Sequence, residues 1–216
     1  MYSSLAWAYH QGKGVAVNNE QAAAWFEKAA ANDDVQAKYM LGFFYEDGRG
    51  VTQNPELAAK WYRDAAEAGS REAMEALGSL YFFGKGVTQD YAQAMKWYRE
   101  PAQQGSTYAQ YLLGYMYEDG KGVEQDLASA SEWYTLAADK GDARAQSRLG
   151  WMYYEGKGID TDLVAAYMWS NLAAAQLSGE ERTRVEKVRD FIASKLTPDE
   201  LTRAQQLARD WKPLEQ

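Results

Sequence analysis

Apolar residues recur at helical spacing in short stretches that end at glycine. Ala37, Leu41 and Tyr45 stand four positions apart, which places them on one face of a helix. Gly48 follows this stripe, and glycine adopts the left-handed conformation that ends a helix at low cost. Asn54 then precedes a second helical stretch, where an asparagine can cap the first turn. The pattern predicts two helices joined by a turn.

This helix pair recurs along the 216 residues with a period of 36. The columns that keep the period are Gly12, Gly48, Gly84, Gly120 and Gly156; Trp25, Trp61, Trp97, Trp133 and Trp169; Tyr9, Tyr45, Tyr81, Tyr117 and Tyr153; and Leu5, Leu41, Leu77, Leu113 and Leu149. The period predicts five repeats, at about 1–33, 34–69, 70–105, 106–141 and 142–177. Stacked helix pairs of this length form an all-α solenoid. Five copies of one turn cannot each be one active site.

The turn sequence YEDGKGVEQD, at 117–126, has the glycines and acids of several ligand-binding loops. It lacks the Gly-x-x-x-x-Gly-Lys-Ser/Thr order of a phosphate loop, and a dinucleotide loop needs a third glycine and a preceding strand. Read as a calcium loop from Asp119, it places Lys121 and Val123 where oxygen ligands are needed. We therefore interpret it as a helix end, a turn and the cap of the next helix. That interpretation gives Glu118 and Asp119 no role.

The repeat resembles a known family. The pattern A-x-x-x-L-G-x-x-Y-x-x-G-x-G-V-x-x-D at 109–126, followed by A-x-x-W-Y-x-x-A-A-x-x-G at 130–141, is similar to the Sel1-like repeat, a relative of the tetratricopeptide repeat. The resemblance covers residues 1 to about 177. It implies a right-handed α-solenoid (α/α superhelix) that acts as a non-enzymatic adaptor or scaffold, with no catalytic residues to carry over. Many bacterial members are periplasmic or exported, and this sequence lacks the disulfides of the cysteine-rich branch.

The period stops after the fifth repeat. Residues 178–216 predict two further amphipathic helices, the first starting at a capping box formed by Ser178 and Glu181, and the second starting at Thr197. A solenoid needs its last repeat covered, and this pair suits a C-terminal cap.

Two features concern the second helix of each repeat. Pro101 lies late in that helix in the third copy, where proline removes a backbone donor, so we expect a kink or an early end there. The column from Trp25 to Trp169 is identical in all five copies, which predicts that these tryptophans belong to the core.

Composition narrows the classes of partner. The formal net charge is −8, with 31 acidic against 23 basic residues. Nucleic-acid binding depends on clustered Lys and Arg, so we expect no nucleic-acid partner. No apolar stretch reaches the roughly 18 residues of a membrane span, so we expect no membrane insertion. The chain has no cysteine and one histidine, His10, and its glycines are accounted for by turns and helix contacts; we expect no metal site, no catalytic residue and no cofactor.

The sequence leaves the compartment open. Its start lacks the basic segment and apolar run of a signal peptide, so the chain reads as a soluble protein, and as a cytoplasmic one if its start is native. The first helix begins without an N-cap, which suggests trimming before Met1. A trimmed natural protein would be periplasmic or exported.

The first helix of each repeat has an unusually aromatic far face. In a tetratricopeptide-like stack this face lines the concave groove, where solvent-exposed rings and acids are typical of a binding surface. The candidate partner-binding residues are Trp7, Tyr39, Phe43, Glu46, Phe82, Tyr111, Tyr115, Glu118, Trp151 and Tyr154. They predict a protein or peptide partner with apolar and basic anchors.

Three alternatives remain at this stage. Neighbouring helices can bury the rings between them, which would make the face part of the core. A groove of rings and acids also suits a glycan, for example from a cell wall, bound or cleaved by the pairs Glu46 with Asp47 or Glu118 with Asp119. Cleavage would require one acid with a raised pKa. Self-association through the solenoid ends or the aromatic face is the third alternative.

Overall fold

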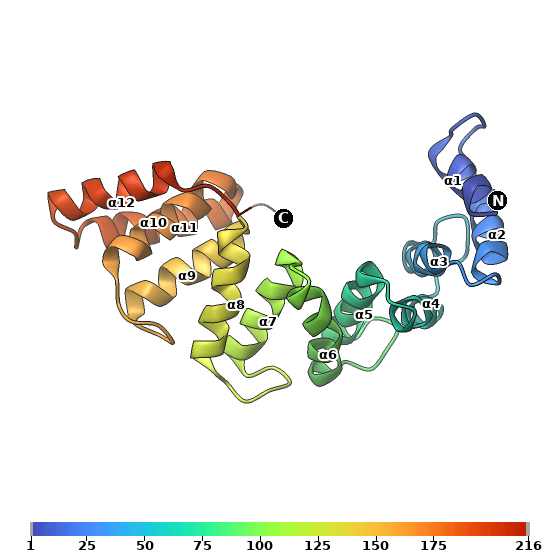
Figure 1. Cartoon of the computed structure of the whole chain (residues 1–216), viewed down its shortest axis with the longest axis horizontal. Helices are drawn as coiled ribbons and strands as arrows, with labels where there is room; N and C mark the ends of the chain where they lie inside the picture. The colour runs from blue at the N-terminus through green and yellow to red at the C-terminus, as the bar shows by residue number, and fades with distance from the viewer. Residues whose placement is uncertain (1, 215–216) are drawn as a thin grey trace. The chain divides into compact units, whose positions relative to one another are not determined.

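A computed structural model describes residues 2–214, which form twelve α-helices and no strand. The helices are α1 (Tyr2–Gln11), α2 (Asn19–Ala30), α3 (Val35–Asp47), α4 (Pro55–Glu67), α5 (Arg71–Phe83), α6 (Tyr91–Gln103), α7 (Thr107–Asp119), α8 (Leu127–Asp139), α9 (Ala143–Glu155), α10 (Leu163–Gln176), α11 (Gly179–Ala193) and α12 (Pro198–Asp210) (Figure 1). They divide into two compact units: unit 1 ends at Pro101 and unit 2 begins at Ala102. The all-α solenoid class is confirmed.

Caps and glycines start and end the helices where the sequence places them. The Asn54 side chain accepts a hydrogen bond from the backbone N–H of Leu57 at 2.9 Å, and Gly48 ends α3 in the left-handed conformation, with φ 71°. The same N-cap role is filled by Asn18, Asp34, Ser70, Asp90, Ser106, Asp126, Asp142 and Asp162. The stretch 117–126 is therefore the end of α7, a turn, and the cap of α8.

A glycine on the first helix of a pair lets a tyrosine ring of the second helix lie against its backbone. A Cβ added at Gly42 would stand 2.5 Å from the Tyr62 ring, and one at Gly114 would stand 2.7 Å from the Tyr134 ring. Tyr62 and Tyr134 are almost completely buried, as is Leu113 on the adjoining face. This glycine-on-tyrosine contact is the centre of each of these helix pairs.

The second glycine of a turn packs on the backbone of the preceding helix pair. A Cβ at Gly158 would lie 2.0 Å from the carbonyl oxygen of Leu127, and one at Gly86 would lie 2.1 Å from that of Pro55. Both glycines also have positive φ, 72° and 67°. The turns therefore hold consecutive repeats together at distances that only glycine permits.

An early helix end, one of the two outcomes expected at Pro101, is wrong, and so is the capping box expected at Ser178. Pro101 lies inside α6, but the helix continues to Gln103 and does not end early. Ser178 occupies the N-cap position of α11, yet its hydroxyl makes no capping hydrogen bond. Gly179, the first residue of α11, has a positive φ of 58°, which turns the first N–H groups away from the serine. The second start is confirmed, because Thr197 and Glu200 form a reciprocal capping box.

The repeated tryptophans are less buried than the neighbouring tyrosines. Trp25 and Trp61 are half-buried beside the core, and Trp169 is buried. The indole nitrogens of Trp25 and Trp61 are nevertheless buried without a hydrogen-bond partner. The column that occupies the centre of the core is the one containing Tyr62 and Tyr134.

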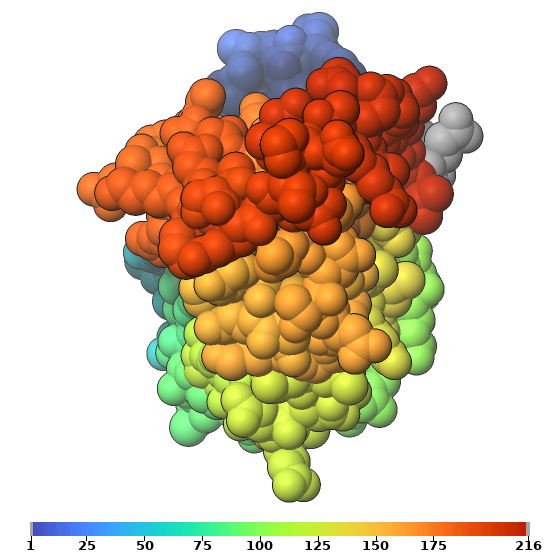
Figure 2. Space-filling model, turned by 90° about the vertical axis from the view of Figure 1, so that its left-hand side faces the viewer, coloured from blue at the N-terminus to red at the C-terminus, as the bar shows by residue number. Residues whose placement is uncertain are grey.

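The two tail helices pack on α10. Val185 and Ile192 of α11 and Ala204 of α12 are buried against α10. The Trp211 ring meets Trp169 edge to face, with centroids 6.1 Å apart. In the space-filling view, α11 and α12 lie across the last helix pair of unit 2 (Figure 2). The tail thus covers apolar surface of α10.

Candidate functional site

Trp7 and Phe43, predicted as surface anchors in unit 1, are half-buried. The Trp7 ring meets Phe26 edge to face at 5.5 Å between centroids. The guanidinium of Arg49 lies 4.5 Å above the centre of the Phe43 ring. Each ring therefore combines a packing contact with a partly exposed edge.

Tyr39 and Glu46 of α3 both contact the buried Tyr62 of α4. The Tyr39 and Tyr62 rings are 5.8 Å apart, and the Tyr62 hydroxyl donates to the Glu46 carboxylate at 2.8 Å. Burial, followed by the negative charge of Glu46, raises the pKa of Tyr62, so this hydroxyl remains a donor. Phe82 is only 8% exposed and meets Tyr91 edge to face. Glu46 and Phe82 therefore have structural roles.

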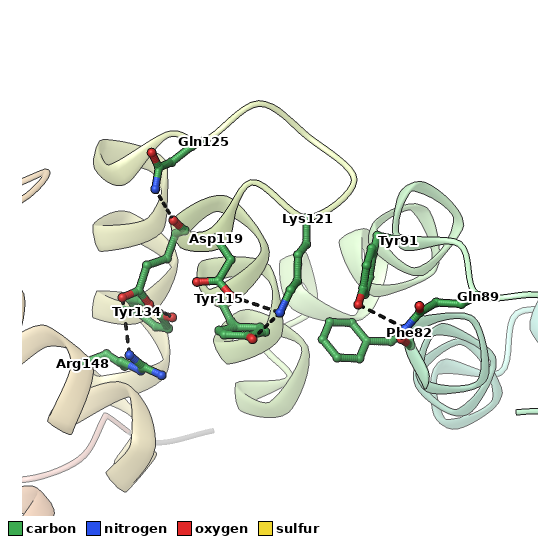
Figure 3. Close-up of polar contacts among 10 residues, drawn as sticks. Phe82, Gln89, Tyr91, Tyr115, Asp119, Lys121, Gln125, Tyr134 and Arg148 are labelled. Carbon is green, nitrogen blue, oxygen red and sulfur yellow. Dashed lines mark hydrogen bonds and ion pairs between the residues drawn. The ribbon is translucent and has the colours of Figure 1, made fainter. Parts of the chain in front are cut away.

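The same arrangement recurs in unit 2 with an arginine added. The hydroxyl of Tyr134 donates to Glu118 at 2.6 Å, and Arg148 of α9 approaches the same carboxylate at 3.5 Å. Tyr134 and Arg148 converge from α8 and α9 in Figure 3. Tyr111 lies 5.8 Å from the Tyr134 ring and 4.4 Å below the guanidinium of Arg144.

Tyr115 forms a cluster with Asp119, the last residue of α7, and with Lys121 of the following turn (Figure 3). Lys121 pairs with the Asp119 carboxylate at 3.0 Å, donates to the Tyr115 hydroxyl, and lies 4.2 Å from the centre of its ring. Burial alone raises the pKa of Asp119, but hydrogen bonds from Lys121 and Tyr115 outweigh it and hold the pKa below its ordinary value. Turn pairs of this kind are Asp47 with Arg49, Asp119 with Lys121, and Glu155 with Lys157. The acids that the turn motif left unexplained thus have partners within the chain.

The Asp119 pair should make stability depend on pH. Because the folded state lowers the pKa of this carboxyl, its contribution is present above about pH 4, the pKa of an unfolded Asp, and is lost as pH falls through the folded pKa. The pair is partly exposed, so we expect less than about 1 kcal/mol. Urea unfolding of wild type and Asp119→Asn should differ most near pH 6 and converge near pH 2. A difference that stays constant across this range would contradict the assignment.

Trp151 and Tyr154 of α9 begin an aromatic strip that continues onto the tail. Trp151 is 38% exposed, and its ring lies 5.4 Å from Tyr154. Tyr154 in turn meets Phe191 of α11 edge to face at 5.6 Å, and Phe191 is 48% exposed. Sequence reasoning missed Phe191 because this residue lies outside the repeat period. Of the ten predicted residues, Trp151 is the most open to solvent.

A cavity of about 370 Å³ opens between α7, α9, α10 and α11, beside Trp151. Its lining includes Tyr111 and Trp151, which the sequence predicted, and three arginines that it did not: Arg144, Arg148 and Arg184. The sequence did hold a signal for one of them. The column of Arg148 reads Ser4, Met40, Ala76, Leu112 and Arg148, so the last copy alone carries a charge, where the three copies before it are apolar.

The cleavage hypothesis predicts an acid with a raised pKa at the pair of Glu118 and Asp119, and Asp119 does not meet this prediction. General acid catalysis needs a carboxyl with a raised pKa, whereas the pKa of Asp119 is lowered and Glu118 accepts the Tyr134 hydrogen bond. Over residues 2–214 no group of three or more His, Asp or Glu side chains could hold a metal ion. None of the described helices is both long and apolar enough to cross a membrane.

Comparison with known proteins identifies the repeat. The family model described as Sel1 repeat matches residues 2–34, 35–70, 71–106, 107–142 and 143–176. Among solved structures, c5321, a protective antigen of uropathogenic Escherichia coli strains displaying an SLR fold, is 33% identical, with a TM-score of 0.83 over 97% of this chain. The chain spans 45% of the length of that protein. A Sel1 repeat protein from Oxalobacter formigenes is 30% identical, with a TM-score of 0.83 over 98% of this chain and 87% of the other. No curated protein matches.

Proposed function

Because this chain belongs to the Sel1 repeat family, whose members generally mediate protein–protein interaction, we propose that it is a non-enzymatic scaffold. It binds a protein or peptide segment on the aromatic faces of the first helices of its repeats. In unit 2 that surface is formed by Tyr111, Tyr115, Trp151 and Tyr154, with Glu118 beside them. In unit 1 the corresponding positions are Trp7, Tyr39, Phe43, Glu46 and Phe82, of which Glu46 and Phe82 serve the internal contacts described above.

The observation that carries the proposal is the exposure of Trp151 beside an open cavity. Tryptophan and tyrosine dominate the energetic centres of protein interfaces, where they fill or flank pockets. Trp151 is 38% exposed, lines the cavity, and packs against the ring of Tyr154. The more buried rings, such as Phe82 and Tyr39, support this surface from below.

The partner contributes apolar anchors to these rings. The sequence also predicted that the partner has basic side chains that bind acids of this surface. The structure supports this less, because Asp47, Asp119 and Glu155 each already pair with a nearby basic residue of this chain. Charge selection in unit 2 comes instead from the arginines around the cavity.

Site-specific photo-crosslinking tests the proposal. A photoreactive phenylalanine analogue is placed at Trp151, on the first helix of the fifth repeat, or at Leu136, which is 47% exposed on the second helix of the fourth repeat. In cells of the source organism, we expect a discrete crosslinked protein from position 151 and none from position 136. Crosslinks of equal yield from the two positions, or none from either, would contradict the proposed surface.

A further inference from the structure

The cavity coincides with two places where the fifth repeat lacks a large side chain. On the second helix, the first four copies carry Phe26, Tyr62, Tyr98 and Tyr134, whereas the fifth carries Ser170. On the first helix, two of the preceding copies carry tyrosine, Tyr39 and Tyr111, where the fifth carries Ser147. Ser147 and Ser170 both line the cavity.

Contacts in the fourth repeat show what the fifth has lost. There the Tyr134 ring packs on Gly114, lies beside Tyr111, and donates its hydroxyl to Glu118. In the fifth repeat a Cβ added at Gly150 would stand only 2.5 Å from the Ser170 hydroxyl oxygen. Ser170 therefore occupies the place of the first side-chain atoms of the tyrosine, and it carries no ring to fill the space beyond them. The remaining space is closed on one side by apolar residues, namely Leu177, Val185 and Val188. An apolar side chain from a partner can therefore take the place of the missing ring.

Three arginines line this space, against one acidic residue, Glu181. Arg144 is held by Asp142 at 2.8 Å, and Arg148 reaches Glu118 only at 3.5 Å. Arg184 makes no ion pair or hydrogen bond within residues 2–214. Each arginine has five N–H donors, so all three retain donors for a further acceptor. A carboxylate matches the planar, paired donors of arginine.

We propose that this cavity binds the C-terminal residue of a partner polypeptide, with its carboxylate on Arg148 and Arg184 and an apolar last side chain in the space that tyrosine fills in other repeats. A C-terminal residue carries both groups on one Cα, which suits a cavity of about 370 Å³ whose arginines and apolar wall stand together. An internal Asp or Glu offers the charge without an apolar group on the same residue. The proposal rests on the proposed function and specifies the end of the partner that this site holds.

Short acetylated peptides with a common polar stem test the proposal directly. They end in Leu, Ile, Phe, Gly or Lys, and each is made with a free C-terminal carboxylate and as the amide. Binding to the whole chain is measured by fluorescence polarisation of a label on the stem. We expect the peptides ending in Leu, Ile or Phe to bind as free acids, and their amides to bind at least about tenfold more weakly, since the charge-assisted hydrogen bonds are lost.

Two variants locate the binding within the cavity. Ser147→Tyr introduces the tyrosine that two other copies carry at this repeat position, Tyr39 and Tyr111. Its ring would fill the cavity from α9. Arg184→Glu reverses the charge of a side chain without partners in residues 2–214. Both variants should bind the free-acid peptides about tenfold or more weakly than wild type does. Arg203→Glu on α12 makes the same charge change on an exposed side chain outside the cavity, and should bind like wild type.

The outcomes separate this inference from the proposed function. Equal binding of acids and amides that Ser147→Tyr abolishes would overturn the C-terminal specificity and leave peptide binding at this surface intact. Binding that neither Ser147→Tyr nor Arg184→Glu affects would also overturn the inference. If no peptide binds wild type, the inference falls, and the crosslinking at Trp151 decides the proposed function separately.

Discussion

Replacing Gly158 by alanine should lower the free energy of unfolding by about 3 kcal/mol. Alanine at a φ of 72° pays the steric cost of the left-handed conformation, about 1 kcal/mol or more. Its methyl group would also stand 2.0 Å from the carbonyl oxygen of Leu127, a backbone atom that cannot rotate away. Overpacking of this kind costs about 1–3 kcal/mol. The change should appear as a lower urea midpoint in circular dichroism.

Gly14→Ala is the matched control for Gly158→Ala. Gly14 occupies the same column of the repeat and has a similar φ, 78°, but a Cβ there meets nothing within 4 Å. It should therefore cost only the conformational part, about 1 kcal/mol. Equal losses for the two variants would show that the contact between consecutive repeats at Leu127 contributes nothing, contrary to the packing described above.

The second large effect is expected at Tyr134, where alanine should cost about 4 kcal/mol. The ring is completely buried against Gly114, and removing a buried aromatic side chain typically costs about 3–5 kcal/mol. Its hydroxyl also satisfies Glu118 at 2.6 Å. Chemical denaturation followed by tryptophan fluorescence would measure the loss.

Tyr134→Phe separates the ring from the hydroxyl. This variant keeps the buried ring and removes only the donor to Glu118, a carboxylate that Arg148 also approaches. It should cost about 1.5 kcal/mol, the usual range for a hydrogen bond to a charged group. If Tyr134→Phe lost as much free energy of unfolding as Tyr134→Ala, the ring would not be the main source of stability at this position.

The repeat architecture was predictable because its signals are local. A glycine such as Gly48 ends its helix through its own backbone conformation, and a cap such as Asn54 bonds to the N–H three residues later. These requirements depend on neighbours in sequence, so the period of 36 carries them directly. Ser178 shows the limit, because the positive φ of the next residue, Gly179, displaced the N–H groups that its hydroxyl needed.

The candidate site was predictable only in part, because its properties depend on contacts between elements. The sequence identified Trp151 and Tyr111, yet it gave no measure of how far neighbouring helices bury each ring. It missed the cavity because Arg184 lies on α11, outside the period, and reaches the site only when the tail packs on α10. The serine at position 170 was visible in the sequence, but its meaning appeared only with the open space beside it.

We propose that unit 2 receives its partner on the first-helix face around Trp151, away from the second-helix tryptophans. The eight tryptophan indole N–H groups report on both faces in a ¹⁵N–¹H NMR spectrum, and Trp151→Phe assigns the relevant signal. On addition of a free-acid peptide ending in Leu, we expect the Trp151 signal to shift while those of Trp61, Trp97 and Trp133 stay in place. Shifts among the latter three with Trp151 unmoved would contradict it.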